Sequence, residues 1–203
     1  MATKKISYEI TSAAIKDDYC HYSFDITEGT GEGDTHAVKG KGIIDDDMRE
    51  VFTRLNVHLA CIDDIFKHSK TEVKSINKMH NNELTGLYRV EGFKIKGSED
   101  NMSVILIGTK YLSTSGHMAL DTPKIALDKH SAYKWWSELK DVITDACEEV
   151  KLYKEGKYTE PEEPEIVNPK QMKLTDVVED LKGAGVTSIS VGGKAIDFDK
   201  AKK

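Results

Sequence analysis

The feature that most constrains this fold is one change in the spacing of its apolar residues. From Cys20 to Ile26 apolar side chains alternate with polar neighbours, which is the period of a half-buried strand. From Asp45 to Lys67 they recur at steps of three and four, which places them on one stripe of a helix. At ~1.5 Å per residue this helix is roughly 35 Å long. The chain is therefore expected to pack a long helix across a sheet.

Further strands follow that helix. We predict a hairpin with arms at 87–96 and 102–111, and a strand over 117–127. Pro123 indicates that this last strand lies at an edge or bends. The run Val104–Ile107 is apolar at every position, which predicts that the second arm is a central strand covered on both faces.

The order of these elements favours one fold class. A second long helix is predicted over 131–153, so strands occur in blocks and do not alternate regularly with helices. This order predicts an α+β fold with a mainly antiparallel sheet. It fits both an OB-like barrel and a curved sheet wrapped around the first long helix. Element order alone does not separate the two.

A change in composition divides the chain. We predict a main α+β domain over 1–157, an acidic, proline-rich linker over 158–172 and a small C-terminal element over 173–203. The C-terminal element is predicted to contain a short amphipathic helix at 174–181 and a hairpin near 186–198. It is too small to hold a core alone, so it either docks or awaits a partner.

Composition excludes several classes of protein. The chain is 38% hydrophobic and 32% charged, which suits one core with a well-solvated surface. No window approaches the ~20 apolar residues of a membrane span, and no signal-peptide core follows the N-terminus. We therefore expect a cytoplasmic protein without membrane contact. Cys20, Cys61 and Cys147 lie far apart, which favours reduced, buried thiols over a disulfide or a zinc site.

No motif in the sequence points to catalysis or to a cofactor. The glycine-rich segment 29–33 carries acidic residues and leads into a strand, so a hairpin tip is favoured over a phosphate-binding loop. The aspartates at 45–47 suit the start of a helix, and those at 63–64 suit a solvated helix face, better than a metal site. No nucleophile can be paired with a base. We predict no catalytic residue, metal or cofactor.

Basic and aromatic residues are interleaved on the predicted hairpin. They are Tyr88, Arg89, Phe93, Lys94 and Lys96 on the first arm, and Lys110 and Tyr111 on the second. Uninterrupted alternation puts Tyr88, Lys94 and Lys96 on one face and Arg89 with Phe93 on the other. Such a surface suits single-stranded nucleic acid, because bases stack on rings and cations neutralise phosphates. The alternative is that the rings belong to the core and the lysines solubilise an edge.

Trp135 is a candidate contact for a protein partner. It precedes Trp136 at the start of the second helix, and adjacent helix positions point about 100° apart. Trp136 can then enter the core while Trp135 lies at the boundary, where it either covers the sheet edge or meets a partner. Together with the C-terminal element it suggests contacts with other proteins or a homo-oligomer.

Part of the chain resembles a known group of proteins. The segment 90–93, the run 104–110, the Thr122-Pro123 strand and the helix ending near Val150 resemble small uncharacterised proteins of bacteriophages and prophages. The resemblance covers about residues 88–158 and contains no catalytic motif. It implies a phage-type origin in a bacterial host and no established activity.

Two classes of function follow from the sequence. The first is a non-enzymatic phage or prophage protein that binds single-stranded DNA in replication or recombination. Its support is the hairpin and the OB-compatible order of elements. The second is a protein-interaction or virion-assembly component, or an inhibitor of a host defence protein, supported by the hinged C-terminal element.

Overall fold

The computed structural model describes residues 6–28, 34–97, 101–159, 188–191 and 194–197. The chain divides into two compact units, Met1–Pro161 and Glu162–Lys203. The strands of the first unit are β1 (Ile6–Lys16), β2 (Tyr19–Glu28), β3 (Asp34–Val38), β4 (Tyr88–Lys96), β5 (Ser103–Leu112), β6 (Gly116–Asp121) and β7 (Ile125–Ala126). Its helices are α1 (Asp46–Ile62), α2 (Ile65–His68) and α3 (Trp136–Lys154), with 3-10 turns η1 (Ile76–Met79) and η2 (Thr85–Leu87).

The strands of the first unit form one open antiparallel sheet. Its order is β3-β2-β1-β4-β5-β6, and β7 pairs with β5 beside that path. The α+β fold and the antiparallel sheet are therefore confirmed. β3 and β6 are the two edge strands and do not pair with each other. The sheet therefore does not close into the OB-like barrel, which was one of the two alternatives that the sequence allowed.

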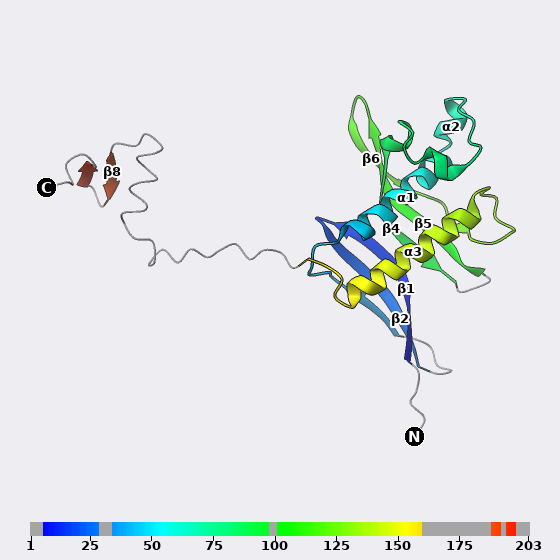
Figure 1. Cartoon of the computed structure of the whole chain (residues 1–203), viewed down its shortest axis with the longest axis horizontal. Helices are drawn as coiled ribbons and strands as arrows, with labels where there is room; N and C mark the ends of the chain where they lie inside the picture. Colours follow the sequence, from blue (N-terminus) through cyan, green and yellow to red (C-terminus); the bar gives the residue numbers. More distant parts are fainter. Residues whose placement is uncertain (1–5, 29–33, 98–100, 160–187, 192–193, 198–203) are drawn as a thin grey trace, which may run out of the picture. The chain divides into compact units, whose positions relative to one another are not determined.

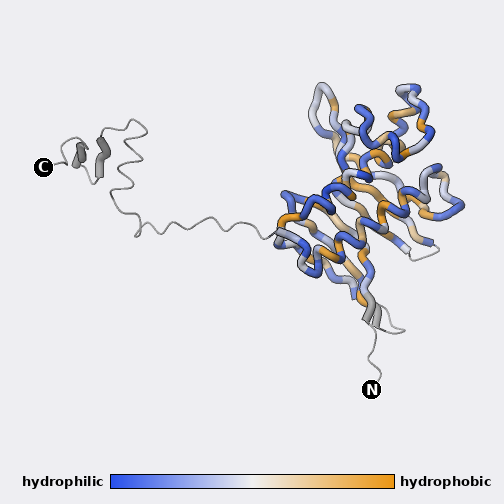
Figure 2. Tube along the Cα trace, in the orientation of Figure 1, coloured by the Kyte–Doolittle hydropathy of each residue, from blue (hydrophilic) through white to orange (hydrophobic). Residues whose placement is uncertain are grey.

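Both long helices lie on the same face of this sheet. Figure 1 shows α1 and α3 side by side across the strands, and the residue contacts join α1 to β4 and α3 to β1 and β2. Apolar residues recur along both helices and along the strands in Figure 2. The core forms between the two layers. Its largest fully buried apolar side chains include Phe93, Met48, Leu55, Leu59, Leu106, Leu139 and Ile143.

The first long helix is shorter than its apolar stripe. Asp45 caps α1 by accepting a hydrogen bond from the Met48 amide at 3.0 Å. The helix ends at Ile62, and Asp64 then adopts a left-handed conformation with φ of 56°. Phe66 still reaches the core, but from the separate short helix α2.

The opposite face of the sheet carries no helix among the described residues. Val104 and Leu106 of β5 are fully buried beneath the helices, whereas Ile105 and Ile107 are only partly buried. Among the described residues, therefore, helices cover this strand on one face and not on both as predicted. We call the surface opposite α1 and α3 the open face. Because side chains alternate along a strand, each strand contributes every second residue to it.

A β-bulge in β4 shifts this alternation. Val90 pairs with Gly108, and Gly92 pairs with Ile107, so Glu91 is an extra residue with no partner of its own. The alternation of side chains between the two faces of the sheet is therefore reversed after Glu91.

The bulge decides which hairpin residues share a face. Phe93 joins Tyr88 on the helix side, where both are buried. Lys94 and Lys96 join Arg89 on the open face, and all three are exposed. The grouping predicted from uninterrupted alternation is therefore wrong beyond the bulge.

The remaining elements include the predicted bend at Pro123. β6 ends at Asp121 and β7 begins at Ile125, so the chain turns between them.

In the second unit β8 (Ser188–Val191) pairs antiparallel with β9 (Lys194–Asp197). The predicted helix at 174–181, most of the linker and the loop 29–33 lie outside the described residues. No helix in the described part of the chain could cross a membrane.

Candidate nucleic-acid interface

Three cations line the open face along β4. Arg89, Lys94 and Lys96 are all exposed, and none forms an ion pair with another described residue. Lys94 and Lys96 are two positions apart, which separates them by about 6.7 Å along the strand. They form a row of positive charge on a protein whose net charge is −6, and the local field governs binding at a site.

An exposed aromatic residue extends this row onto the next strand. Tyr111 on β5 is 49% exposed and is the most exposed large apolar side chain described. It pairs with His117 on β6, and their rings meet edge to face with centroids 5.5 Å apart. Thr109, two residues before Tyr111 and on the same face, pairs with Arg89. The ring therefore lies near the first cation of the row.

Two of the predicted aromatic residues belong to the core. Tyr88 is 2% exposed and Phe93 is fully buried, with its ring centroid 5.8 Å from that of Phe52 on α1. A buried ring has no free face on which a base can stack. For these two residues the alternative interpretation, that the rings are core, matches where the structure places them.

Lys110 also lies on the helix side of the sheet. Its Nζ donates to Asp63 Oδ2 at 2.5 Å, and the Tyr88 hydroxyl donates to the same oxygen. The hydrogen bond to Asp63 is the main cause that raises the pKa of Lys110. This ammonium is held by a carboxylate on α1, so it is not part of the row on β4.

Small residues give the open face a shallow hollow beside Lys94. The hollow has a volume of about 460 Å³ and lies over β1 and β2. Its lining includes Ser12, Ala14, Ser23, Ala37, Lys39 and Lys94. The sequence pattern did not predict this hollow. The only signal was the run of small residues in β1 and β2, which becomes meaningful only when the pairing of these strands is known.

Trp135 packs at the boundary of the core. It is partly buried against the core cluster, and Lys134 Nζ lies 4.4 Å from the centroid of one of its rings. It immediately precedes α3. The Trp135 ring therefore packs mainly against the core and projects little from the surface.

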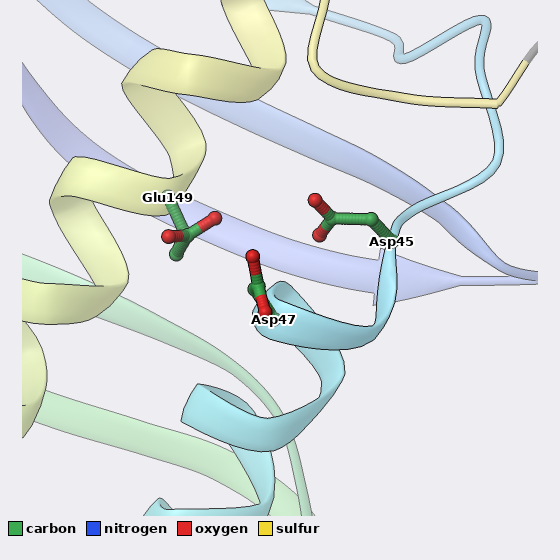
Figure 3. A group of neighbouring side chains, drawn as sticks. All are labelled: Asp45, Asp47 and Glu149. Carbon is green, nitrogen blue, oxygen red and sulfur yellow. The ribbon is translucent and has the colours of Figure 1, made fainter.

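Three carboxylates converge between the two long helices. Asp45 and Asp47 at the start of α1 point toward Glu149 on α3 (Figure 3). Lys157 Nζ lies between them, at 3.2, 2.7 and 2.7 Å from their respective oxygens. An ammonium therefore stands where a cation would be held.

The thiols are not activated. Burial raises the pKa of Cys20 to about 12, of Cys61 to about 11 and of Cys147 to about 12. All three thiols are therefore protonated near neutral pH, whereas nucleophilic and metal-ligating cysteines are thiolates.

Comparison of the chain with protein-family models, with curated proteins and with solved structures gave no match.

Proposed function

We propose that the open face of the sheet binds single-stranded nucleic acid. The observation that carries the proposal is the bulge at Glu91, because it places Phe93 in the core beside Tyr88 and collects Arg89, Lys94 and Lys96 on the open face. An uncovered sheet with cations and an exposed ring is a surface on which single strands are bound.

The three cations and the exposed ring have different parts in this proposal. Arg89, Lys94 and Lys96 contact phosphates along the strand, and Tyr111 stacks on a base. Base–aromatic stacking is worth about 1–3 kcal/mol per base. The hollow over β1 and β2 accommodates neighbouring nucleotides, since its small side chains leave space above the sheet. A phage or prophage protein of replication or recombination is the context that we propose for this activity.

The direct test is fluorescence anisotropy with labelled single-stranded DNA at several salt concentrations. Three neutralised phosphates predict a slope of log K against log[salt] of about −2 for a single strand. Arg89→Gln/Lys94→Gln should reduce that slope by about 1.4 and weaken binding. Tyr111→Ala should weaken binding by about fivefold to a hundredfold at constant slope.

A matched control distinguishes an effect at the proposed site from an effect of the net charge of the protein. Lys67→Gln/Lys74→Gln removes two exposed charges from α2 and the segment after it, away from the open face. This variant should bind as the unmodified chain does. Equal losses in both double variants, equal affinity for duplex, or no binding at tens of micromolar protein would each reject the proposal.

Protein binding is the second candidate function. Its support is the exposed edge strands β3 and β6, because unpaired strand edges can pair with another chain. Light scattering of the full chain over a range of concentrations tests self-association through these edges. A strictly monomeric chain would leave only contacts with other proteins.

A further inference from the structure

The pairing of β1 with β4 is unusually short. β1 pairs with β2 along its whole length, but with β4 only over Ser12–Ala14. A register irregularity at Thr11 marks the point where this pairing stops. Before it, the residues Ile6–Ile10 have no strand partner on the side of β4 among the described residues. The two strands therefore diverge.

A cavity fills the space between the diverging strands. Its volume is about 1000 Å³. Ile10 and Ile95 come from the two strands, Met102 precedes β5, and Ile143 and Cys147 come from α3. We call it the fork cavity. It is at the upper end of the volume range of small-molecule sites, about 300–1,000 Å³, and its apolar wall is typical of them.

Three lysines line the fork cavity. They are Lys96 at the end of β4 and Lys140 and Lys151 on α3. None forms an ion pair with a described residue. Lys140, Ile143, Thr144, Cys147 and Lys151 share one stripe of α3 at helical spacing, so the helix presents cations, a hydroxyl and an apolar surface together. Cations without an ion-pair partner among the described residues, set around an apolar wall, favour an anionic ligand with an apolar body.

The β1 and β2 side of the cavity has the opposite character. Glu9 and Asp25 line it, and Thr35 donates a hydrogen bond to Asp25 Oδ1 at 2.6 Å. Carboxylates accept hydrogen bonds from hydroxyl and amino groups. The cavity therefore suits a ligand with an anionic group at one end and hydrogen-bond donors at the other. A nucleotide has this combination, because its phosphate is anionic while its sugar and base carry donors and a flat ring.

The fork cavity and the proposed strand path have Lys96 in common. Lys96 is the last cation of the row on β4 and also lines the fork cavity. We infer that the fork cavity binds a nucleoside monophosphate group, either free or as the phosphorylated end of a single strand. The phosphate contacts Lys96 and Lys140, and the base lies against Ile10, Ile95 and Ile143. Binding of a strand end rests on the proposed function, whereas binding of a free nucleotide does not.

The experiment compares four ligands with the full chain. They are thymidine monophosphate, thymidine, and one oligothymidine carrying either a 5′-phosphate or a 5′-hydroxyl. Isothermal titration measures affinity, and alkylation of Cys147 followed by peptide mapping reports occupancy of the cavity. A bound ligand should slow alkylation of Cys147 severalfold and leave Cys20, which is fully buried, unchanged. The phosphorylated end should bind about tenfold more tightly than the hydroxyl end, which corresponds to one extra favourable contact of the dianion.

Variants locate the phosphate. Lys140→Gln/Lys151→Gln should remove the preference for the phosphorylated ligands and the protection of Cys147. Affinity for the 5′-hydroxyl strand should stay the same, because Arg89 and Lys94 are intact. The matched control is Lys124→Gln/Lys129→Gln, which removes two lysines outside the fork cavity. It should keep both the preference and the protection.

The possible outcomes separate this inference from the proposed function. Strand binding without any preference for phosphate, and without protection of Cys147, overturns the inference and leaves the proposed function standing. Binding of thymidine monophosphate in the cavity without any strand binding supports a free-nucleotide site and rejects the proposed function. Absence of binding for all four ligands rejects both.

Discussion

The ammonium of Lys110 and the carboxylate of Asp63 form a direct contact between β5 and the end of α1, with 2.5 Å between Nζ and Oδ2. The Tyr88 hydroxyl donates to the same oxygen, also at 2.5 Å. Both charged side chains are about a quarter exposed, at 20% and 24%. The contact joins the sheet to the helix layer and takes Lys110 out of the nucleic-acid surface.

Removing this carboxylate charge should destabilise the fold in a pH-dependent way. Partial burial acts to raise the pKa of Asp63, but the hydrogen bonds from Lys110 and Tyr88 outweigh it and the pKa is lowered. A lowered pKa stabilises the folded state above about pH 3.9, and this stabilisation is lost as the pH falls through the folded value. Asp63→Asn should cost about 1–2 kcal/mol near neutral pH, after discounting for solvent exposure. Urea denaturation should show that the cost shrinks below about pH 4. A cost that does not change with pH would contradict this account.

His58 should make the protein sensitive to mild acid. Burial lowers its pKa to about 3, with His80 and Arg54 adding to the effect, and its Nδ1 lies 2.9 Å from the Tyr133 hydroxyl. Between about pH 6.5 and pH 3 the unfolded chain binds a proton that the folded chain does not, so stability falls as the pH falls. At about pH 4.5 this group alone removes about 2–3 kcal/mol.

The variant His58→Gln tests that account. It should lose stability at pH 7, because a packed side chain is changed, but its further loss on acidification should be smaller than that of the unmodified chain. The exposed His130→Gln serves as the control and should keep the full pH dependence. Identical pH dependence in all three proteins would show that His58 does not govern it.

The extra residue in the β4 bulge should be essential for stability, whereas the identity of its side chain should matter little. Deleting Glu91 would restore plain alternation, turn Phe93 toward the open face and bring Lys94 toward the core. The free energy of unfolding should fall by more than is expected for Phe93→Ala, which is about 3–5 kcal/mol. Glu91→Ala keeps the extra residue and should change stability by no more than about 0.5 kcal/mol. Urea denaturation compares the three variants, and an equally large loss in Glu91→Ala would assign the effect to the side chain.

Lys157 should act as an internal counter-ion for three carboxylates. Its hydrogen bonds to Asp47 and then Glu149 are the main causes that raise its pKa. Lys157→Gln leaves Asp45, Asp47 and Glu149 facing one another without a positive charge, which resembles an oxygen site for Ca²⁺. Calcium should therefore raise the melting temperature of Lys157→Gln and leave that of the unmodified chain unchanged. Lys154→Gln is the control, and a response to calcium in the unmodified chain would contradict the expectation.

The local patterns in the sequence predicted most of the elements. The helix containing Met48 and Leu55, the hairpin that became β4 and β5, and the turn at Pro123 all depend on spacing or on a residue with a fixed backbone preference. The end of α1 at Ile62 was not predicted, because Phe66 continues the apolar stripe from a separate helix. Propensity and spacing do not report where two helices share one core.

The candidate site was predicted only in part. Arg89, Lys94 and Lys96 are exposed together, and Tyr111 lies beside them, as the hairpin pattern suggested. Tyr88 and Phe93 were grouped with opposite faces, because one extra residue at position 91 is invisible in a period-two pattern until the strand partner is known.

The sequence by itself determined that this chain has an antiparallel sheet, two long amphipathic helices and an interleaved basic and aromatic hairpin, since these follow from local spacing. Only the tertiary structure decided which face of the sheet the helices cover, where β1 and β4 diverge and which lysine pairs with which carboxylate. Those properties depend on contacts between residues far apart in the chain, such as Asp63 with Lys110 and Glu149 with Lys157. A local pattern holds no information about such pairs, because many pairings satisfy the same spacing and only the packing of the whole core selects among them.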